Sequence, residues 1–119
     1  MGKKVLVCDD SILARKKLKN LLVESGIEDV VEAADGQQAV DKYKEIKPDF
    51  VFMDIVMPVK DGVDAVKEIV EFDANAFVVM VSSVGTKEYL HNAIKNGAKD
   101  FIQKPIEDSR FKELISKLV

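Results

Sequence analysis

The chain has 119 residues, of which 47% are hydrophobic and 33% are charged, a size and composition typical of one globular domain. Its net charge of −3 offers no basic surface for nucleic acid, and no apolar run approaches the roughly 20 residues that span a membrane. Only four apolar residues follow Lys4 and the chain has one cysteine, so neither a secretory leader nor an internal disulfide is expected. We therefore expect a single cytoplasmic domain over residues 1–119, present as a monomer.

Short apolar runs alternate with segments of helical spacing from one end of the chain to the other. The runs predict strands at residues 5–8, 30–34, 50–53, 77–81 and 99–103. Helices are expected between these strands and after the last one, and Ser11 and Asp35 stand where N-caps are needed. The fourth helix is expected over about residues 86–96, burying Leu90, Ala93 and Ile94.

Five such βα units with short connections predict an α/β fold on a doubly wound, five-stranded parallel sheet of the flavodoxin-like kind. Right-handed crossovers leave few strand orders open, and the sequence alone does not choose among them. The order 2-1-3-4-5, known from other doubly wound proteins, places the first and third strands side by side. We adopt it because the charged cluster described next requires those two strands to be neighbours.

Four charged residues stand at the ends of predicted strands. Asp9 and Asp10 directly follow the first strand, Asp54 follows the third, and Lys104 follows the fifth. Because the carboxyl ends of parallel strands meet at one edge of a sheet, these side chains should converge there. Three carboxylates at close quarters repel one another. Such an all-oxygen cluster predicts a hard divalent cation, and Mg²⁺ is the ion expected.

Asp54 is the residue that we expect to carry the chemistry. A carboxylate at a strand end can attack phosphorus and form an aspartyl phosphate, a step that needs positioning and charge neutralisation above all. Lys104 would supply a positive charge to a phosphoryl oxygen, and Ser82, after the fourth apolar run, a hydroxyl to another. An aspartate after a strand is usually only a turn former. The interpretation therefore rests on all these groups falling at the same end of successive strands.

In combination these residues resemble the motif set of response-regulator receiver domains, over essentially the whole chain. The matching positions are Asp9-Asp10, Asp54, Met57-Pro58 with Gly62, Ser82-Ser83 and Lys104-Pro105. The resemblance implies that a histidine kinase transfers a phosphoryl group to Asp54. It also implies how Mg²⁺ is held: directly by Asp10, Asp54 and the backbone carbonyl of Val56, and by Asp9 through a metal-bound water.

The resemblance further implies a switch. Ser82 matches the switch hydroxyl, Ser83 matches the small residue that leaves the phosphoryl group access, and the bond before Pro105 is cis in relatives. The switch aromatic is Phe101, where many relatives have tyrosine, so signalling through a tyrosine hydroxyl is excluded. The output surface, where a downstream protein would bind, is expected on the fourth helix, the fifth strand and the fifth helix.

Two valines yield a prediction about the lifetime of the phosphorylated state. Val56 and Val84 stand two residues past Asp54 and Ser82 and should flank the phosphoryl group. Because valine cannot hydrogen-bond an attacking water, we expect slow self-hydrolysis. The chain is then a phosphoacceptor that assists its own phosphorylation and slow dephosphorylation, not a turnover enzyme.

Several roles stay open for such a switch, because the chain ends with its fifth helix and shows no output domain. It could bind a flagellar motor or another chemotaxis component, pass phosphate along a relay, or act as a phosphate sink. Similarity to stand-alone chemotaxis regulators favours the first role. A phosphohydrolase of the haloacid dehalogenase type would need a second aspartate where Val56 stands. A flavin carrier shares the fold, but the acidic site repels flavin phosphate.

Overall fold

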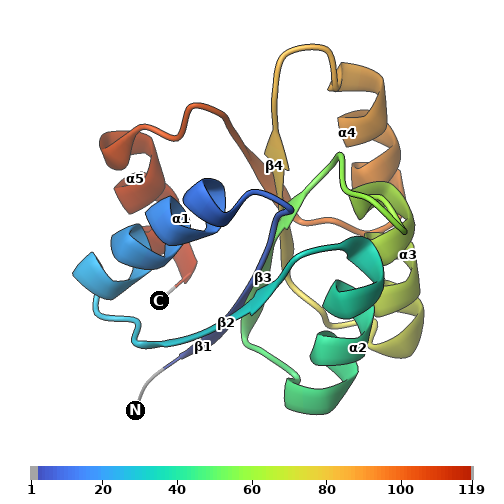
Figure 1. Ribbon diagram of the computed structural model, residues 1–119, viewed down its shortest axis with the longest axis horizontal. Helices are drawn as coiled ribbons and strands as arrows, with labels where there is room; N and C mark the ends of the chain where they lie inside the picture. The colour runs from blue at the N-terminus through green and yellow to red at the C-terminus, as the bar shows by residue number, and fades with distance from the viewer. Residues whose placement is uncertain (1–2, 119) are drawn as a thin grey trace.

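The strands form where the apolar runs predict them, to within one residue at each end. The structure, a computed structural model, describes residues 3–118. Within this range the strands are β1 (Lys4–Cys8), β2 (Asp29–Ala33), β3 (Phe50–Asp54), β4 (Val78–Ser82) and β5 (Asp100–Gln103). They pair in parallel as one five-stranded sheet, which runs through the middle of the molecule (Figure 1).

The sheet order is β2-β1-β3-β4-β5, which confirms the order adopted from the sequence. Strand β1 lies between β2 and β3, with Cys8 opposite Met53 in the register with β3. On the other side of β3, Asp54 lies opposite Val81 of β4. The strands therefore end nearly level, and the residues that follow β1, β3 and β5 leave the sheet along the same edge.

Five helices in the described range cover the two faces of the sheet. They are α1 (Ile12–Glu24), α2 (Gly36–Ile46), α3 (Gly62–Phe72), α4 (Lys87–Lys95) and α5 (Asp108–Leu118). Helices α1 and α5 lie on one face, and α2, α3 and α4 lie on the other (Figure 1). None of these described helices combines the length and the apolar character that crossing a bilayer requires.

The hydrophobic core consists of two clusters, one on each face of the sheet. Alternate residues of β1 point to opposite faces, so Val5 and Val7 join the cluster under α1 and α5 while Leu6 and Cys8 join the other. The central strands β3 and β4 are buried at every position. This burial explains their unbroken apolar sequences and makes them a rigid base for the residues at their ends.

Both predicted N-caps are confirmed. The Ser11 hydroxyl oxygen accepts a hydrogen bond from the backbone N–H of Ala14 at 3.2 Å, and the Asp35 carboxylate accepts one from Gln38 at 2.8 Å. Each cap satisfies an N–H group that has no partner inside its helix. The caps fix where α1 and α2 begin, directly beyond the carboxyl ends of β1 and β2.

The burial predicted for α4 is partly wrong. Ala93 is buried and Leu90 is half-buried, but Ile94 is 41% exposed. The helix has nine residues and packs on the molecule through Ala93 as its only fully buried residue. Ile94 therefore stays partly in solvent, because the contact through Ala93 covers only one side of the helix.

Candidate functional site

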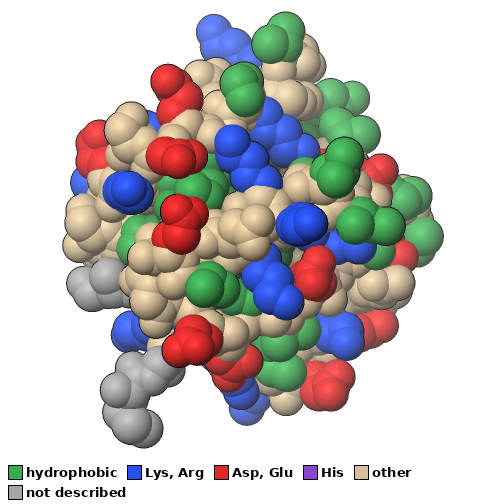
Figure 2. All heavy atoms as spheres, turned by 60° about the vertical axis from the view of Figure 1, so that its left-hand side comes forward, with side chains coloured by type: hydrophobic (Ala, Val, Ile, Leu, Met, Phe, Trp, Pro, Cys, Tyr) green, Lys and Arg blue, Asp and Glu red, His purple; other side chains and the backbone are tan. Residues whose placement is uncertain are grey.

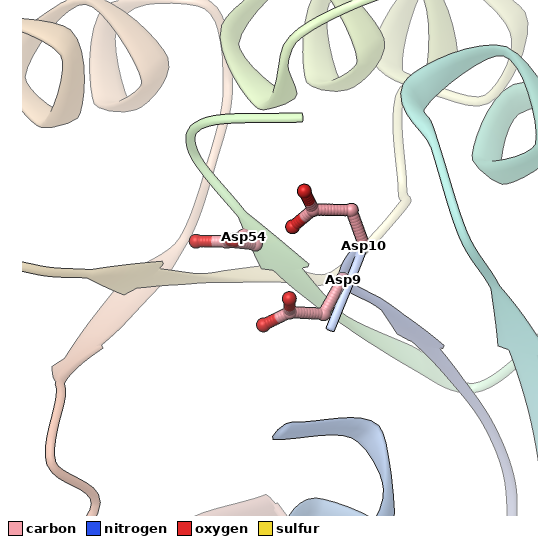
Figure 3. Close-up of side chains that lie close together, drawn as sticks. All are labelled: Asp9, Asp10 and Asp54. Carbon is pink, nitrogen blue, oxygen red and sulfur yellow. The ribbon is translucent and has the colours of Figure 1, made fainter. Parts of the chain in front are cut away.

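The three aspartates predicted to converge do so. Each of Asp9, Asp10 and Asp54 offers a carboxylate oxygen, and these oxygens all lie within 4.8 Å of one another (Figure 3). Asp9 is 1% and Asp54 is 6% exposed, whereas Asp10 is exposed. The pairing of β1 with β3 produces this arrangement, because it brings the ends of two distant segments side by side.

Lys104 completes the cluster from the end of β5. Its Nζ lies 2.8 Å from Oδ2 of Asp9 and 3.5 Å from Oδ2 of Asp54. The backbone N–H of Lys104 donates to the carbonyl of Ser82 at 2.7 Å, which anchors the connection to β4. The following Lys104–Pro105 bond is cis, as the resemblance implied.

Both carboxylate oxygens of Asp9 are already engaged. Oδ2 forms the ion pair with Lys104, and Oδ1 accepts a hydrogen bond from the N–H of Ser11 at 2.9 Å. These partners compensate the burial of a charged group that would otherwise be unfavourable. Asp10, in contrast, is exposed to solvent at the next position. The two neighbouring aspartates therefore occupy different environments.

The electrostatics of the site favour a cation. Burial, and next the charge of Asp9, raise the pKa of Asp54 to about 6, although Lys104 and the N–H of Ile55 oppose the shift. Burial alone would lower the pKa of Lys104, but its hydrogen bond with Asp9 and the charge of Asp54 raise it overall. One lysine among three carboxylates leaves the site negatively charged.

The residues present fit Mg²⁺. The site offers a compact set of carboxylate oxygens, with excess negative charge and one member open to solvent. Hard divalent cations prefer such ligands, and Mg²⁺ keeps several waters, for which the exposed side of the site has room. The same charge excess would oppose the binding of an anion unless a cation bound as well.

Ser82 lies at the end of β4 with an unsatisfied hydroxyl. The residue is 3% exposed, and within residues 3–118 its Oγ has no hydrogen-bond partner. It lines a cavity of about 320 Å³ together with Leu90 and Phe101. Phe101 itself is 39% exposed. An unpaired buried hydroxyl is unfavourable, so this group is suited to accept or donate a hydrogen bond when a ligand enters the site.

The loops around the acidic cluster carry the remaining predicted residues. Val56 is 61% exposed, and Val84 is fully exposed and lines the same groove as Asp9 and Lys104. Met57 is buried. The three other site-flanking residues, all exposed, are Pro58, Ser83 and Pro105.

Gly62 has a steric role that the sequence pattern did not reveal. A Cβ on this glycine would lie 2.1 Å from the backbone oxygen of Asp54, so no larger residue fits without movement. The Gly62 N–H also donates to the carbonyl of Ile55 at 2.7 Å. The start of α3 is thus pressed against the end of β3, which holds the backbone of Asp54 in place.

Sequence reasoning missed one residue that contacts the site backbone. The Arg15 guanidinium donates to the carbonyl of Asp9 at 2.6 Å and pairs with Glu32 of β2. The segment Arg15-Lys16-Lys17 reads as an ordinary solvated helix face, and Glu32 is 17 residues further on. No local spacing rule connects such a pair, because the contact depends on how α1 lies beside β2.

The chain is similar to known proteins over almost its whole length. The family model of the response regulator receiver domain matches residues 5–116. The chain is 48% identical over 118 residues to the chemotaxis protein CheY of Thermotoga maritima, covering 99% of this chain and 98% of that protein. It is 47% identical over 117 residues to CheY of Bacillus subtilis, covering 98% of each.

A solved structure extends the likeness to three dimensions. The CheX-CheY-BeF3-Mg+2 complex from Borrelia burgdorferi contains a chain that matches with a TM-score of 0.89 and 37% sequence identity. The match covers 98% of this chain and 90% of that one. Sequence and fold thus agree, and the chain belongs to the family of response regulator receiver domains.

Proposed function

We propose that this chain is the phosphoacceptor of a two-component signalling system, and that Asp54 receives the phosphoryl group from a histidine kinase. An Asp54 carboxylate oxygen attacks phosphorus, the bond between phosphorus and the histidine nitrogen breaks, and that nitrogen keeps the electron pair. The observation that carries the proposal is the position of Asp54, at the end of a fully buried strand between two aspartates and Lys104.

Mg²⁺ is the cofactor that we propose for this step. Asp10, Asp54 and the backbone carbonyl of Val56 would hold it directly, and Asp9 through water. When bound, the ion neutralises charge on the phosphoryl oxygens and on Asp54. The acidic cluster supports this assignment, because its three carboxylates lie within reach of a single ion.

Lys104 and Ser82 would bind the phosphoryl oxygens. Lys104 lies 3.5 Å from Asp54, so its ammonium group can pair with an oxygen attached there after a small movement. The Ser82 hydroxyl, which has no hydrogen-bond partner among residues 3–118, would gain one. Its shift toward the phosphoryl group would enlarge the cavity beside Phe101 and favour an inward position of that ring.

A groove beside the site supports a protein as the phosphoryl donor. It has a volume of about 530 Å³ and reaches Asp9 and Lys104, and its apolar wall includes Leu18 and Ile106. Figure 2 brings the side of α1 and α5 forward and shows basic side chains across the middle of this face with hydrophobic ones nearby. We propose that the kinase approaches over this groove.

The output is proposed to leave through the face formed by α4, β5 and α5. Its exposed hydrophobic residues are Tyr89, Ile94 and Phe101. A downstream protein that binds this face more tightly in one state would read the switch, and 1–3 kcal/mol of differential affinity is about what such coupling needs. The names of the CheY relatives support a chemotaxis-type partner; a relay or phosphate-sink role is the alternative.

We propose a switch in preference to a turnover enzyme. Val56 stands where an aspartyl-phosphate phosphohydrolase of the haloacid dehalogenase type has its general acid, and its exposed apolar side chain cannot transfer a proton. The proposal also includes that the 119 residues act as one cytoplasmic, monomeric domain.

Labelling by a small acyl phosphate tests the assignment. Wild-type protein should acquire one phosphoryl group per chain in the presence of Mg²⁺ and lose this ability with a chelator. Asp54→Asn should abolish labelling, whereas Asp41→Asn, an exposed aspartate on α2, should leave it intact. Labelling that persists in the Asp54→Asn protein would refute Asp54 as the acceptor.

A further inference from the structure

Arg15 joins the edge strand to the acidic cluster. Its guanidinium donates from Nη1 to the backbone carbonyl of Asp9 at 2.6 Å and from Nε to Oε1 of Glu32 at 2.9 Å. Arg15 lies in the first turn of α1, and Glu32 lies on β2. The Arg15 side chain is 14% exposed and that of Glu32 is 39% exposed, so the ion pair lies at the surface while the bond to the Asp9 carbonyl is partly buried.

The contact determines the orientation of one peptide unit. The carbonyl of Asp9 belongs to the planar peptide that continues with the nitrogen of Asp10. On its other side, the N–H of Asp9 donates to the carbonyl of Ala33 in β2 at 3.0 Å. Holding both backbone groups of Asp9 fixes the direction in which the chain enters Asp10, whose own side chain is exposed.

We propose that Arg15 is a positioning residue of the cation site, and that Glu32 orients it. This inference rests on the proposed function in one respect, that Asp10 is a ligand of Mg²⁺. It assigns β2 a part in the site, although no side chain of that strand joins the acidic cluster. The chain of contacts runs from Glu32 through Arg15 to the Asp9 carbonyl, and from there to Asp10.

Arginine suits this task better than lysine would. Its planar guanidinium presents donors in a rigid fork, so one side chain can hold a carboxylate and a carbonyl at a fixed angle. A lysine can reach only one of the two with defined geometry. The positioning argument therefore predicts that Arg15→Lys retains part of the effect and that Arg15→Met retains none.

Charge alone predicts the opposite result. Arg15 places a positive charge beside the intended site of a dication, and removing it should strengthen cation binding if electrostatics decide. If positioning decides, removing it should weaken binding despite the lost repulsion. The sign of the change in Mg²⁺ affinity therefore separates the two effects.

The test is the Mg²⁺ dissociation constant of the full unphosphorylated chain, measured by isothermal titration calorimetry. Arg15→Met should weaken binding about tenfold, the scale seen when a residue that supports metal ligands is removed. Lys16→Met is the matched control, since it removes the same charge from an exposed neighbour, and it should leave binding unchanged or slightly tighter.

A second variant tests the order of the contacts. Glu32→Gln should weaken binding by a smaller factor than Arg15→Met in the wild-type background. It should have no further effect when Arg15 is already methionine, because Glu32 acts through Arg15. Urea unfolding of each variant verifies that the compared proteins are folded at the titration temperature.

Equal or tighter Mg²⁺ binding by folded Arg15→Met, or additive effects in the double variant, would overturn the inference while leaving the proposed function intact. If wild-type protein itself fails to bind Mg²⁺, the proposed cation site is wrong and the inference fails with it. Equally weak binding by Lys16→Met would likewise overturn the inference, because that residue forms no hydrogen bond or ion pair with Asp9 or Glu32 and the loss would then not depend on positioning.

Discussion

At the residue scale, the surroundings of Asp54 would determine how long a phosphoryl group stays attached to it if it is the acceptor, as proposed. Val56 is 61% exposed, and Val84 is fully exposed in the groove that Asp9 and Lys104 line. Neither side chain can hold a water molecule through a hydrogen bond. Both are open to solvent, so their replacement by polar residues should be tolerated by the fold.

Val56→Asn combined with Val84→Glu should shorten the life of the phosphorylated protein. The amide and the carboxylate can orient a water for attack on phosphorus, an effect on the order of tenfold in rate for a positioned polar group. Release of inorganic phosphate from labelled, purified protein measures this rate. Ile12→Asn, another exposed apolar position at the start of α1, is the control. An unchanged rate in the double variant would contradict the role given to the valines.

At the element scale, the loop between β3 and α3 is held by a close contact with α2. A Cβ on Gly36, the first residue of α2, would lie 1.9 Å from the backbone oxygen of Lys60. The N–H of the same Lys60 donates a hydrogen bond to the carbonyl of Pro58 at 2.7 Å, which closes a tight turn. Between them Val59 has a φ of 68°, a conformation that β-branched residues rarely adopt. The neighbouring helix therefore helps to hold a strained turn.

Gly36→Ala sets two effects against each other. Helix propensity alone favours alanine by up to about 1 kcal/mol, so an exposed position would be stabilised. The clash with Lys60 is with backbone and cannot be relieved by a side-chain rotation, and such overpacking costs about 1–3 kcal/mol. We expect net destabilisation, measured by urea unfolding, against Glu45→Ala on the exposed face of α2 as control. A more stable Gly36→Ala protein would show that the loop yields easily.

At the scale of the whole molecule, the site reduces folding stability near neutral pH. Without a divalent cation, burial and Asp9 raise the pKa of Asp54 from 3.8 to about 6 in the folded protein. The folded state therefore binds this proton more tightly than the unfolded chain does. As the pH rises from about 4 to about 7 the proton is lost, and the associated stabilisation is lost with it.

Asp54→Asn should accordingly make the metal-free protein more stable at pH 7. The pKa shift of Asp54, discounted for the solvent that reaches the site, corresponds to a gain of about 1–2 kcal/mol in the free energy of unfolding. The advantage should shrink as the pH falls from 7 toward 4, because Asp54 in the folded protein then becomes protonated and its buried charge is removed. Adding Mg²⁺ should stabilise the wild type more than the variant, because binding to the folded state raises stability and the variant lacks one of the proposed ligands. Urea unfolding with and without Mg²⁺ measures these differences, and an Asp54→Asn protein less stable at pH 7 would contradict them.

Much of the fold could be predicted from the sequence because its physical causes are local. Apolar runs of four or five residues define the strands, and the caps at Ser11 and Asp35 define helix starts. The acidic cluster was predictable once β1 and β3 were taken as neighbours, a choice that rested on known folds and on the chemistry. Once these strands are neighbours, the three aspartates must lie close together. The chemical roles of the three aspartates are part of the proposed function.

The features that could not be predicted depend on contacts between distant segments. Ile94 has the spacing of a buried residue, yet whether α4 covers it depends on how the helix sits on the sheet. The contact between Arg15 and Glu32 depends on how α1 lies beside β2. The closeness of Gly36 to Lys60 depends on the path of the intervening loop. None of these leaves a periodic pattern in the sequence.

Helix α4 has a single buried residue, Ala93, and this bears on how a signal could travel through the molecule. Helix α3 buries Ala65, Val66 and Ile69, whereas α4 buries only Ala93 within its span. A methyl group contributes on the order of 1 kcal/mol when buried, about as much as one hydrogen bond. Moving α4 therefore takes little work compared with moving its neighbour. If Ser82 gains a hydrogen bond on phosphorylation, as proposed, we expect α4 to shift more readily than α3.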